Sequence, residues 1–155
     1  MSPRQFLPLL AVLIGFSASP LADAPADLEG VKRASKAFYD AVVVVDDGSA
    51  MEKVWAHTPY VTYIGPRSTS IIVGWDAQRK YWPEFNKAFD RRSVALVDAQ
   101  VHVVGNLAWE IGAEQGQAHM KDGATRKVDW FVTNVYEKID GRWLMVSHHV
   151  QPKPQ

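Results

Sequence analysis

The hydrophobic pattern of this 155-residue sequence changes its period near residue 90, and this change constrains the fold more than any other feature. Before it, apolar residues recur at three- and four-residue intervals, which is typical of amphipathic helices. The spacing predicts helices over residues 26–46, 49–55 and 75–89, and short strands over 60–64 and 71–73. After it, apolar and polar residues alternate, which predicts four long strands over 94–104, 107–119, 125–139 and 142–150. Helices followed by an antiparallel meander define the α+β class.

Two short polar sequences predict where helices begin and end. Ser49 and Glu52 have the spacing of a capping box, in which the two side chains bind backbone N–H groups at a helix start. We therefore expect the short second helix to begin at Ser49. The run Asp90-Arg91-Arg92 is expected to lie on a solvated surface where the third helix ends.

The first 26 residues have the features of a secretory signal peptide. Arg4 supplies a positive charge, and the uncharged apolar run over residues 6–16 is too short to cross a bilayer as a helix. Ala24-Pro25-Ala26 is the preferred cleavage site, because cleavage after Ala24 would leave Pro25 directly behind the cut. A non-cleaved anchor or a buried helix is the alternative. We expect a secreted or periplasmic protein with one domain over 27–150 and a flexible tail over 151–155.

The composition excludes several classes of function. The chain has 17 Lys and Arg and 17 Asp and Glu, so a basic surface for nucleic acid or an anionic membrane is not expected. It has no cysteine, which excludes disulfides, thiol nucleophiles and cysteine-ligated zinc. No glycine-rich phosphate loop or cofactor fingerprint occurs, so no cofactor is expected. His148 and His149 are successive strand residues that point to opposite faces, so they do not predict a metal site.

Two-residue turns in the second half predict which strand residues face each other. Asp140-Gly141 places Tyr136 opposite Met145, Asn134 opposite Ser147 and Val132 opposite His149. One face of this hairpin then carries Trp130, Val132, Asn134, Tyr136, Met145, Ser147 and His149. Gly105-Asn106 similarly predicts a face that carries Val97, Ala99, Val101, Val103, Ala108, Glu110, Gly112 and Glu114.

These two faces predict a ligand cavity. Ala108 and Gly112 are small and leave room into which Glu110 and Glu114 would project. Aromatic side chains are expected to form its walls, with ordinary core packing as the alternative: Tyr63, Tyr81, Trp82 and Tyr136. On the opposite face, Trp109 and Ile111 are expected to be covered by a second subunit of a homodimer.

Glu114 and His149 are the candidate proton carriers of this cavity. Burial among apolar groups would raise the pKa of Glu114 and allow general acid or base catalysis near neutral pH. The alternatives are an ion pair with Arg79 or Lys80, or a side chain in solvent. His149 would have its tautomer fixed by Asn134 and Ser147, and its alternative role is that of a structural histidine.

Three segments carry a family resemblance: Val101–Gly105, Asn134–Trp143 and Val146–His149. With Phe38–Ala41 and Val73–Trp82, they resemble the nuclear transport factor 2-like (NTF2-like) superfamily over about residues 30–150. More narrowly, the chain resembles the SnoaL-like (DUF4440-type) branch, which is similar to the association domain of calcium/calmodulin-dependent protein kinase II. The resemblance implies a cone in which a curved, mostly antiparallel sheet wraps around a long N-terminal helix and leaves a deep pocket.

The resemblance also implies site residues and a range of functions. It places Gln78, Glu114 and Asn134 at pocket positions, with His149 beside them. The kinase association domain has arginines where Glu114 and Asn134 stand, so its preference for acidic ligands is not carried over. We expect a pocket protein that binds a small apolar organic ligand. The alternatives are a cofactor-independent isomerase, dehydratase or hydrolase that uses Glu114 and His149, and an oligomeric assembly module.

Overall fold

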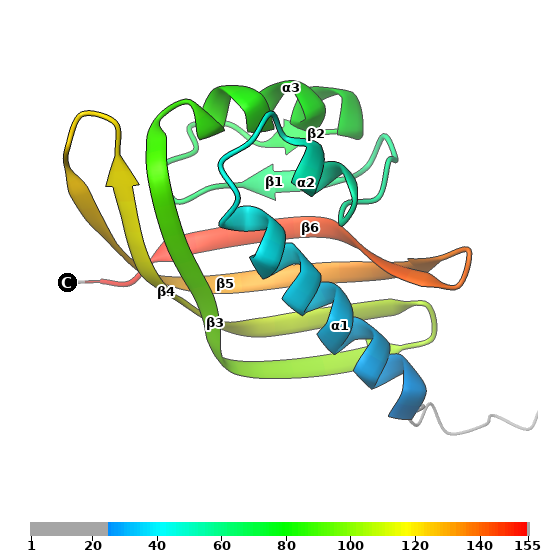
Figure 1. The fold of residues 1–155 in the computed structure, drawn as a ribbon. Helices are drawn as coiled ribbons and strands as arrows, with labels where there is room; N and C mark the ends of the chain where they lie inside the picture. The colour runs from blue at the N-terminus through cyan, green and yellow to red at the C-terminus, as the bar shows by residue number, and fades with distance from the viewer. Residues whose placement is uncertain (1–24, 155) are drawn as a thin grey trace, which may run out of the picture.

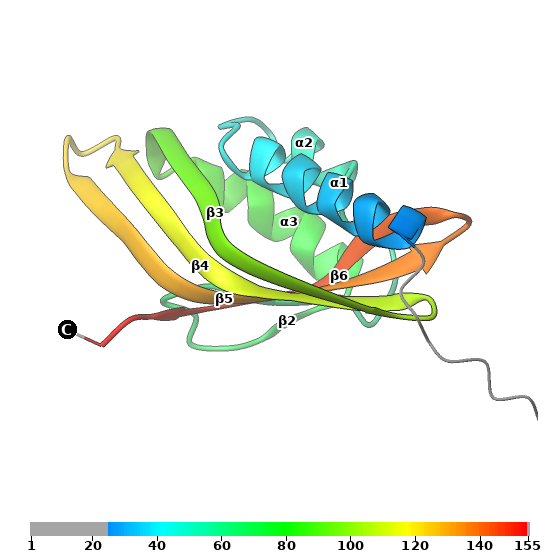
Figure 2. The ribbon, with the colours of Figure 1, turned by 90° about the horizontal axis from the view of Figure 1, so that it is seen from below.

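A long helix lies against the concave face of a strongly curved six-stranded sheet (Figures 1 and 2). The structure is a computed structural model that describes residues 25–154. The helix, α1 (Pro25–Val42), ends four residues before its predicted end, and its buried face includes Val31 and Phe38. The predicted signal peptide falls almost entirely outside the described residues. No helix within residues 25–154 is both long and apolar enough to cross a membrane.

The remaining elements follow the predicted order. They are α2 (Ser49–Glu52), β1 (Thr62–Ile64), β2 (Ile72–Val73), α3 (Trp75–Asn86), β3 (Phe89–Val104), β4 (Leu107–Met120), β5 (Thr125–Ile139) and β6 (Arg142–Pro152). The strand order is β2-β1-β6-β5-β4-β3, and neighbouring strands are antiparallel except for β1 and β6. The predicted α+β class is confirmed, and the sheet is open rather than closed into a barrel.

The helix boundaries differ from the prediction at two places. Ser49 does not form the expected capping box, because the carboxylate of Asp46 accepts hydrogen bonds from the backbone N–H groups of Gly48 and Ala50 and from the Ser49 hydroxyl. α3 ends at Asn86, and Phe89 already belongs to β3. Arg92 is therefore a strand residue, and it is buried rather than solvated.

The register between β3 and β4 agrees with the prediction only near the turn. Val104 pairs with Leu107 and Gln100 with Ile111, as expected, but one extra residue then bulges out of β3, where Asp98 has a φ of 55°. Beyond the bulge, Val94 and Leu96 pack against the core while Ala99 is exposed, so the predicted inward positions of Val97 and Ala99 are wrong.

Gly112 is needed for the close packing of this bulge and does not form ligand space. A Cβ atom at Gly112 would lie 2.9 Å from the carbonyl oxygen of Val97, so the glycine allows the bulged strand to approach β4. Ala108 is likewise fully buried in the core, so neither small residue leaves the open space that was predicted.

A second bulge changes the face of the last strand. Tyr136 pairs with Met145 as predicted, but Val146 is an extra residue in β6, and Val135 then pairs with Ser147. Every later residue of β6 is shifted by one position, which places it on the other face. His148 is consequently buried and pairs with Asn134, whereas His149 is exposed and pairs with Thr133. The predicted inward orientation of His149 and Ser147 is wrong.

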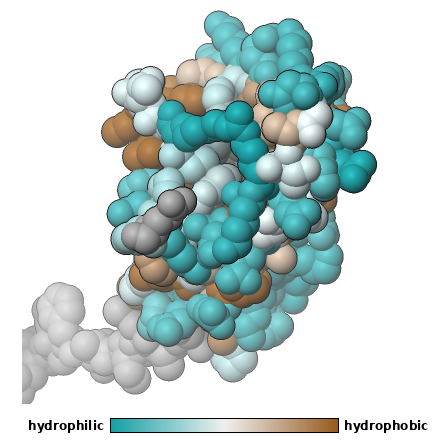
Figure 3. Space-filling model, turned by 90° about the vertical axis from the view of Figure 1, so that its left-hand side faces the viewer, coloured by the Kyte–Doolittle hydropathy of each residue, from teal (hydrophilic) through white to brown (hydrophobic). Residues whose placement is uncertain are grey.

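The two faces of the sheet have different surroundings. The inner face and the helices enclose the core, whose largest fully buried side chains include Trp55, Trp82, Tyr136 and Met145. The outer face of β3, β4 and β5 carries an exposed apolar set: Val104, Leu107, Trp109, Ile111 and Phe131. The side of the molecule that lies at the left in Figure 1, where β4 turns into β5, is largely hydrophilic (Figure 3).

Candidate functional site

Cross-strand pairing arranges the inner face of the sheet in rows. One row consists of Tyr63, His148, Asn134 and Glu110, from β1 to β4. A second row, toward the β4–β5 turn, carries Leu96, Glu114 and Trp130. A third row consists of Arg92, Ala118 and Arg126. Along β4, Glu110, Glu114 and Ala118 are four residues apart and therefore share one face.

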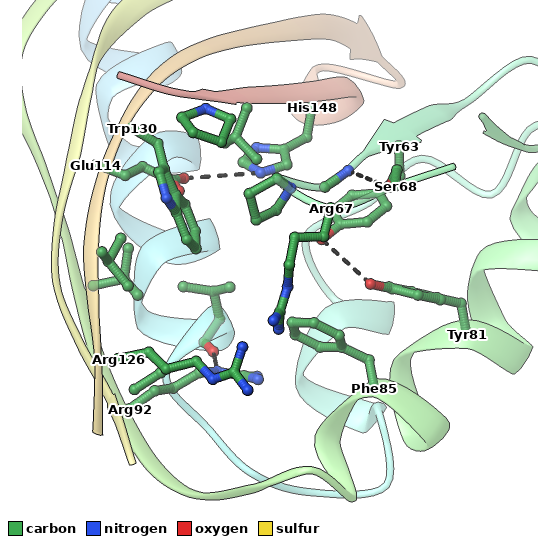
Figure 4. A pocket seen from close by; sticks show the side chains of 18 of the residues that line it. Tyr63, Arg67, Ser68, Tyr81, Phe85, Arg92, Glu114, Arg126, Trp130 and His148 are labelled. Atoms are coloured by element: carbon green, nitrogen blue, oxygen red, sulfur yellow. Dashed lines mark hydrogen bonds and ion pairs between the residues drawn. The ribbon is translucent and has the colours of Figure 1, made fainter. Parts of the chain in front are cut away.

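A cavity of about 700 Å³ opens over the second and third rows (Figure 4). Its aromatic wall comes from β1, α3 and the neighbouring strands: Tyr63, Tyr81, Trp82, Phe85, Phe89 and Trp130. Aliphatic side chains, among them Val94, Val128 and Val150, complete an apolar interior. Glu114 and His148 lie together at one end, and the loop 65–70 forms part of the rim. The volume is that of a site for a small organic molecule.

Glu114 is a buried carboxyl group with little stabilisation of its charge. Its side chain is 4% exposed, and the Tyr39 hydroxyl donates a hydrogen bond of 3.0 Å to Oε1. Burial raises the pKa of Glu114 to about 7, and the Tyr39 hydrogen bond opposes this rise only partly. The expected alternative ion pair is not seen within residues 25–154, since Arg79 is exposed and faces Asp76 at 3.9 Å. Glu114 is therefore able to give or take a proton near neutral pH.

His148 is fixed in one tautomer by its neighbours. The amide nitrogen of Asn134 donates to Glu110 and to the Tyr39 hydroxyl, so the amide oxygen must face His148, whose Nδ1 lies 2.8 Å away. In this assignment Nδ1 carries the proton and Nε2 presents a lone pair. Burial, and to a lesser extent the charge of His149, lowers the pKa of His148 to about 3.

Glu114 and His148 form a pair without the character of a salt bridge. The distance from Nε2 of His148 to Oε1 of Glu114 is 3.8 Å, which would be an ion pair only if the imidazole were protonated. The pKa of each group is shifted toward its uncharged form, so between pH 4.5 and 6.5 both groups are neutral. The pair thus offers a carboxyl proton and an imidazole lone pair to the cavity.

Glu110 belongs to a closed hydrogen-bond network behind the cavity wall. Its Oε2 accepts hydrogen bonds from the Ser35 hydroxyl at 2.9 Å, the Asn134 amide at 3.0 Å and the Tyr136 hydroxyl at 3.0 Å. Glu110, Asn134 and Tyr136 were expected to bind ligand, but they do not line the cavity. The network holds Asn134, which in turn orients His148 and Tyr39.

The other candidate residues divide into two groups. Tyr63, Tyr81 and Trp82 line the cavity as expected. Gln78 is fully buried in α3 outside the cavity lining, and its amide atoms have no hydrogen-bond partner among the described residues. Ser147 accepts a hydrogen bond from the Thr62 hydroxyl at 2.8 Å outside the cavity.

His148 and Arg92 line the cavity and matter for its chemistry, but they were not among the candidates. The sequence contained no clear signal for Arg92, because the charged run Asp90-Arg91-Arg92 is typical of a solvated surface. It contained none for His148, since choosing between the two adjacent histidines requires the position of the bulge in β6. Across residues 25–154 no group of three or more His, Cys, Asp or Glu side chains is placed to hold a metal ion.

Comparison with known families identifies the class of this fold and pocket. A model of the SnoaL-like domain matches residues 31–151, and the chain therefore belongs to the SnoaL-like family. Its structure neighbours are NTF2-like proteins, which confirms the expected superfamily. No protein with a curated description matches the sequence.

Three solved structures illustrate this similarity. A candidate dehydratase of the NTF2-like family from Streptomyces avermitilis is 20% identical, with a TM-score of 0.74 over 84% of this chain and 98% of its own. A candidate aromatic ring hydroxylase from Novosphingobium aromaticivorans is 15% identical, with a TM-score of 0.76 over 86% and 94%. The association domain of CaMKII from C. elegans is 19% identical, with a TM-score of 0.63 over 82% and 96%. At these identities the likeness shows the fold alone.

Proposed function

We propose that this protein binds a small, largely apolar organic molecule in the cavity that ends at Glu114 and His148. The observation that carries this conclusion is an apolar, aromatic-walled space of about 700 Å³ with two convergent polar groups at one end. Apolar walls supply affinity, and a few fixed polar groups orient the ligand.

Proton transfer on the bound ligand is a second function, favoured by the environment of Glu114. A carboxyl group with a pKa of about 7 is populated in both forms at neutral pH. As a carboxylate, Glu114 would remove a proton from a carbon next to a carbonyl group and return it to another carbon of the same molecule, which is an isomerisation without net change in atoms. The lone pair on Nε2 of His148 would accept a hydrogen bond from a ligand hydroxyl.

Both functions are tested by one experiment in two steps. A thermal-shift screen of small ketones and aromatic compounds first identifies ligands, with unfolding midpoints raised by binding. The bound ketones are then incubated in D₂O, and deuterium incorporation is followed by NMR for the wild type and for Glu114→Gln. We expect exchange to slow by roughly 10²- to 10⁴-fold in the variant while binding persists.

The exposed Glu84→Gln variant is the matched control, and its exchange rate should equal that of the wild type. Equal exchange in Glu114→Gln and the wild type would exclude the catalytic function but leave ligand binding. If no compound of the screen raises the unfolding midpoint, and crystals soaked with the same ketones and aromatic compounds keep an empty cavity, both functions are excluded.

The exposed apolar set on the outer face of the sheet supports assembly into a homodimer. Trp109 and Ile111 are 38% and 50% exposed, and a neighbouring copy would cover them. We expect Ile111→Lys to convert the dimer to a monomer in sedimentation velocity. Val73→Lys, at an equally exposed apolar residue in β2, should leave the dimer intact. A monomeric wild type at all accessible concentrations would contradict this part of the proposal.

Secretion is also part of the proposal, on the basis of the first 26 residues. Cleavage after Ala26 would make Asp27 the first residue, and Asp27 accepts hydrogen bonds from Lys138 and Trp143 that anchor the start of α1. Mass spectrometry of the exported protein is expected to give a chain that begins at Asp27. A full-length chain retained in the cytoplasm would contradict secretion.

A further inference from the structure

The cavity contains a buried guanidinium group with no counter-ion among the described residues. Arg92 is 8% exposed and lines the cavity, at the end opposite Glu114 and His148 (Figure 4). Its Nη1 nitrogen is buried and has no hydrogen-bond partner within residues 25–154. A charged donor that is removed from water without an acceptor is costly, so this group requires an explanation.

Neutral groups hold the other nitrogens of Arg92 in place. Nε donates to the carbonyl oxygen of Val42, and Nη2 donates to the carbonyl oxygen of Val44 at 3.1 Å and to Oδ1 of Asn86 at 2.7 Å. The guanidinium carbon also lies 4.9 Å from the ring centre of Phe89, a contact that favours the cation. These contacts fix the position of the group, but none of them supplies a negative charge.

The carboxylate of Asp46 attracts the charge of Arg92 without a direct hydrogen bond, and its oxygens are already hydrogen-bonded to other groups. Its oxygens accept hydrogen bonds from the backbone N–H groups of Gly48 and Ala50. Burial lowers the pKa of Arg92 to about 10, which still leaves the guanidinium charged at neutral pH. Because Arg92 lines the cavity, its positive charge acts on a molecule bound there.

The surroundings of Arg92 leave space for such a molecule. Ala118 pairs with Arg92 on one side and with Arg126 on the other, so a small residue separates two arginines in the same row. Arg126 is exposed and lines the cavity, as does Arg67 on the loop 65–70. Figure 4 shows the side chains of Arg67, Arg92 and Arg126 around the same cavity as Glu114 and His148.

We propose that the ligand of this cavity is an organic carboxylate whose anionic group binds Nη1 of Arg92 while its apolar body extends toward Glu114 and His148. This inference rests on the proposed ligand-binding function and specifies its chemical class. Arg92 stands four residues from Leu96, the partner of Glu114, which is roughly 13 Å along the strand. Val94 and Val128 line the cavity in the row between these two ends, and an apolar body such as a phenyl ring on a short aliphatic chain suits that surface.

The test compares an acid with its neutral amide. Isothermal titration calorimetry at pH 7.5 with 4-phenylbutanoate and 4-phenylbutanamide is expected to show roughly 10- to 100-fold tighter binding of the acid by the wild type. Arg92→Met should bind both compounds about equally. Arg91→Met is the matched control, because Arg91 is adjacent on β3 with a side chain 70% exposed, and it should keep the preference for the acid.

Each outcome separates this inference from the proposed function. Equal binding of acid and amide by the wild type overturns the inference and leaves the ligand-binding cavity. Failure of both compounds to bind, in a protein for which the thermal-shift screen has found other apolar ligands, overturns the inference and leaves the proposed function. A 4-phenylbutyl phosphate that binds more tightly than the acid, with the same dependence on Arg92, would overturn the carboxylate in favour of a phosphate ester. Should Arg92→Met fail to fold, a crystal structure of the wild type with the acid decides, since a carboxylate away from Nη1 of Arg92 contradicts the inference.

Discussion

Glu110 and Glu114 stand four residues apart on the same face of β4, and their side chains are 2% and 4% exposed, yet their surroundings differ. Glu110 lies under α1 and accepts three hydrogen bonds, from Ser35, Asn134 and Tyr136. Glu114 faces the cavity and accepts one, from Tyr39. The protein therefore supplies the donors of one carboxyl group and leaves those of the other to a ligand.

This difference shows how a buried carboxyl group becomes either structural or functional. The two groups are linked, because the Asn134 amide donates to both Glu110 and the Tyr39 hydroxyl, which in turn donates to Glu114. The hydrogen-bond network around Glu110 (the closed network) therefore orients Glu114 and His148 (the open pair), which face the cavity. Four single variants and one double variant test this distinction.

The largest effect on stability is expected when the hydrogen-bond network around Glu110 is disrupted. Glu110→Leu keeps the approximate volume but removes the acceptor of three buried donors. We expect the free energy of unfolding to fall by roughly 3–5 kcal/mol, measured by urea denaturation at pH 7. Glu84→Leu, at an exposed position of α3, is the control and should change stability by less than about 0.5 kcal/mol. A Glu110→Leu protein with wild-type stability would mean that the network contributes nothing.

The next effect concerns Glu114 and depends on pH. Its pKa is raised from 4.5 to about 7 in the folded protein, so the folded state holds a proton that the unfolded chain has lost. The stability from this group is fully present below pH 4.5 and is lost as the pH rises through 7. Glu114→Gln removes this loss, and its stability relative to the wild type should rise by about 3 kcal/mol from pH 4.5 to pH 8. Parallel stability curves for the two proteins would contradict the raised pKa.

His148 should show a slope of the opposite sign. Its pKa is lowered from 6.5 to about 3. Between these pH values the imidazole is protonated in the unfolded chain but neutral in the folded protein. Stability from this group is present above pH 6.5 and is lost as the pH falls toward 3. Relative to the wild type, His148→Gln should therefore gain roughly 2–3 kcal/mol from pH 6.5 down to pH 4.5.

In the wild type the Glu114 and His148 contributions to the pH dependence of stability have opposite signs between pH 4.5 and 6.5 and largely cancel. Glu114→Gln should therefore show the slope due to His148, and His148→Gln the slope due to Glu114. The double variant Glu114→Gln, His148→Gln is expected to restore a pH dependence close to that of the wild type in this interval. A double variant that keeps the slope of either single variant would contradict the paired titration.

The sequence predicts the sheet face on which Glu110, Asn134, Tyr136 and Glu114 lie, but not the hydrogen-bond network among them or the position of His148, and the bulges explain part of this difference. β4 and β5 alternate without interruption, so Glu110, Glu114, Asn134 and Tyr136 lie on the predicted face. β3 contains two extra residues and β6 one, and the register derived from the turns fails beyond the first of them in each strand. Asp98 has a positive φ without being a glycine, and Val146 is an ordinary strand residue. Neither residue has a local property that marks a bulge.

Arg92 was missed for a different reason. The charged run Asp90-Arg91-Arg92 is typical of a solvated surface, and burial of an arginine is rare unless its donors are satisfied. Its acceptors come from the end of α1 and from Asn86 in α3. Such contacts are tertiary, and a pattern within one strand does not contain them.

The smallest effect is expected at His149, and it sharpens the distinction between the two adjacent histidines. The bulge at Val146 leaves His149 exposed, so His149→Ala should change the free energy of unfolding by less than about 0.5 kcal/mol at pH 7. Its charge contributes to the lowered pKa of His148, so its removal should raise that pKa slightly and leave the slope of stability with pH almost unchanged. Urea denaturation from pH 4.5 to 6.5 measures both quantities. A large loss of stability in His149→Ala, together with no change of the pH slope in His148→Gln, would contradict the bulge at Val146. It would indicate that His149, not His148, faces the cavity.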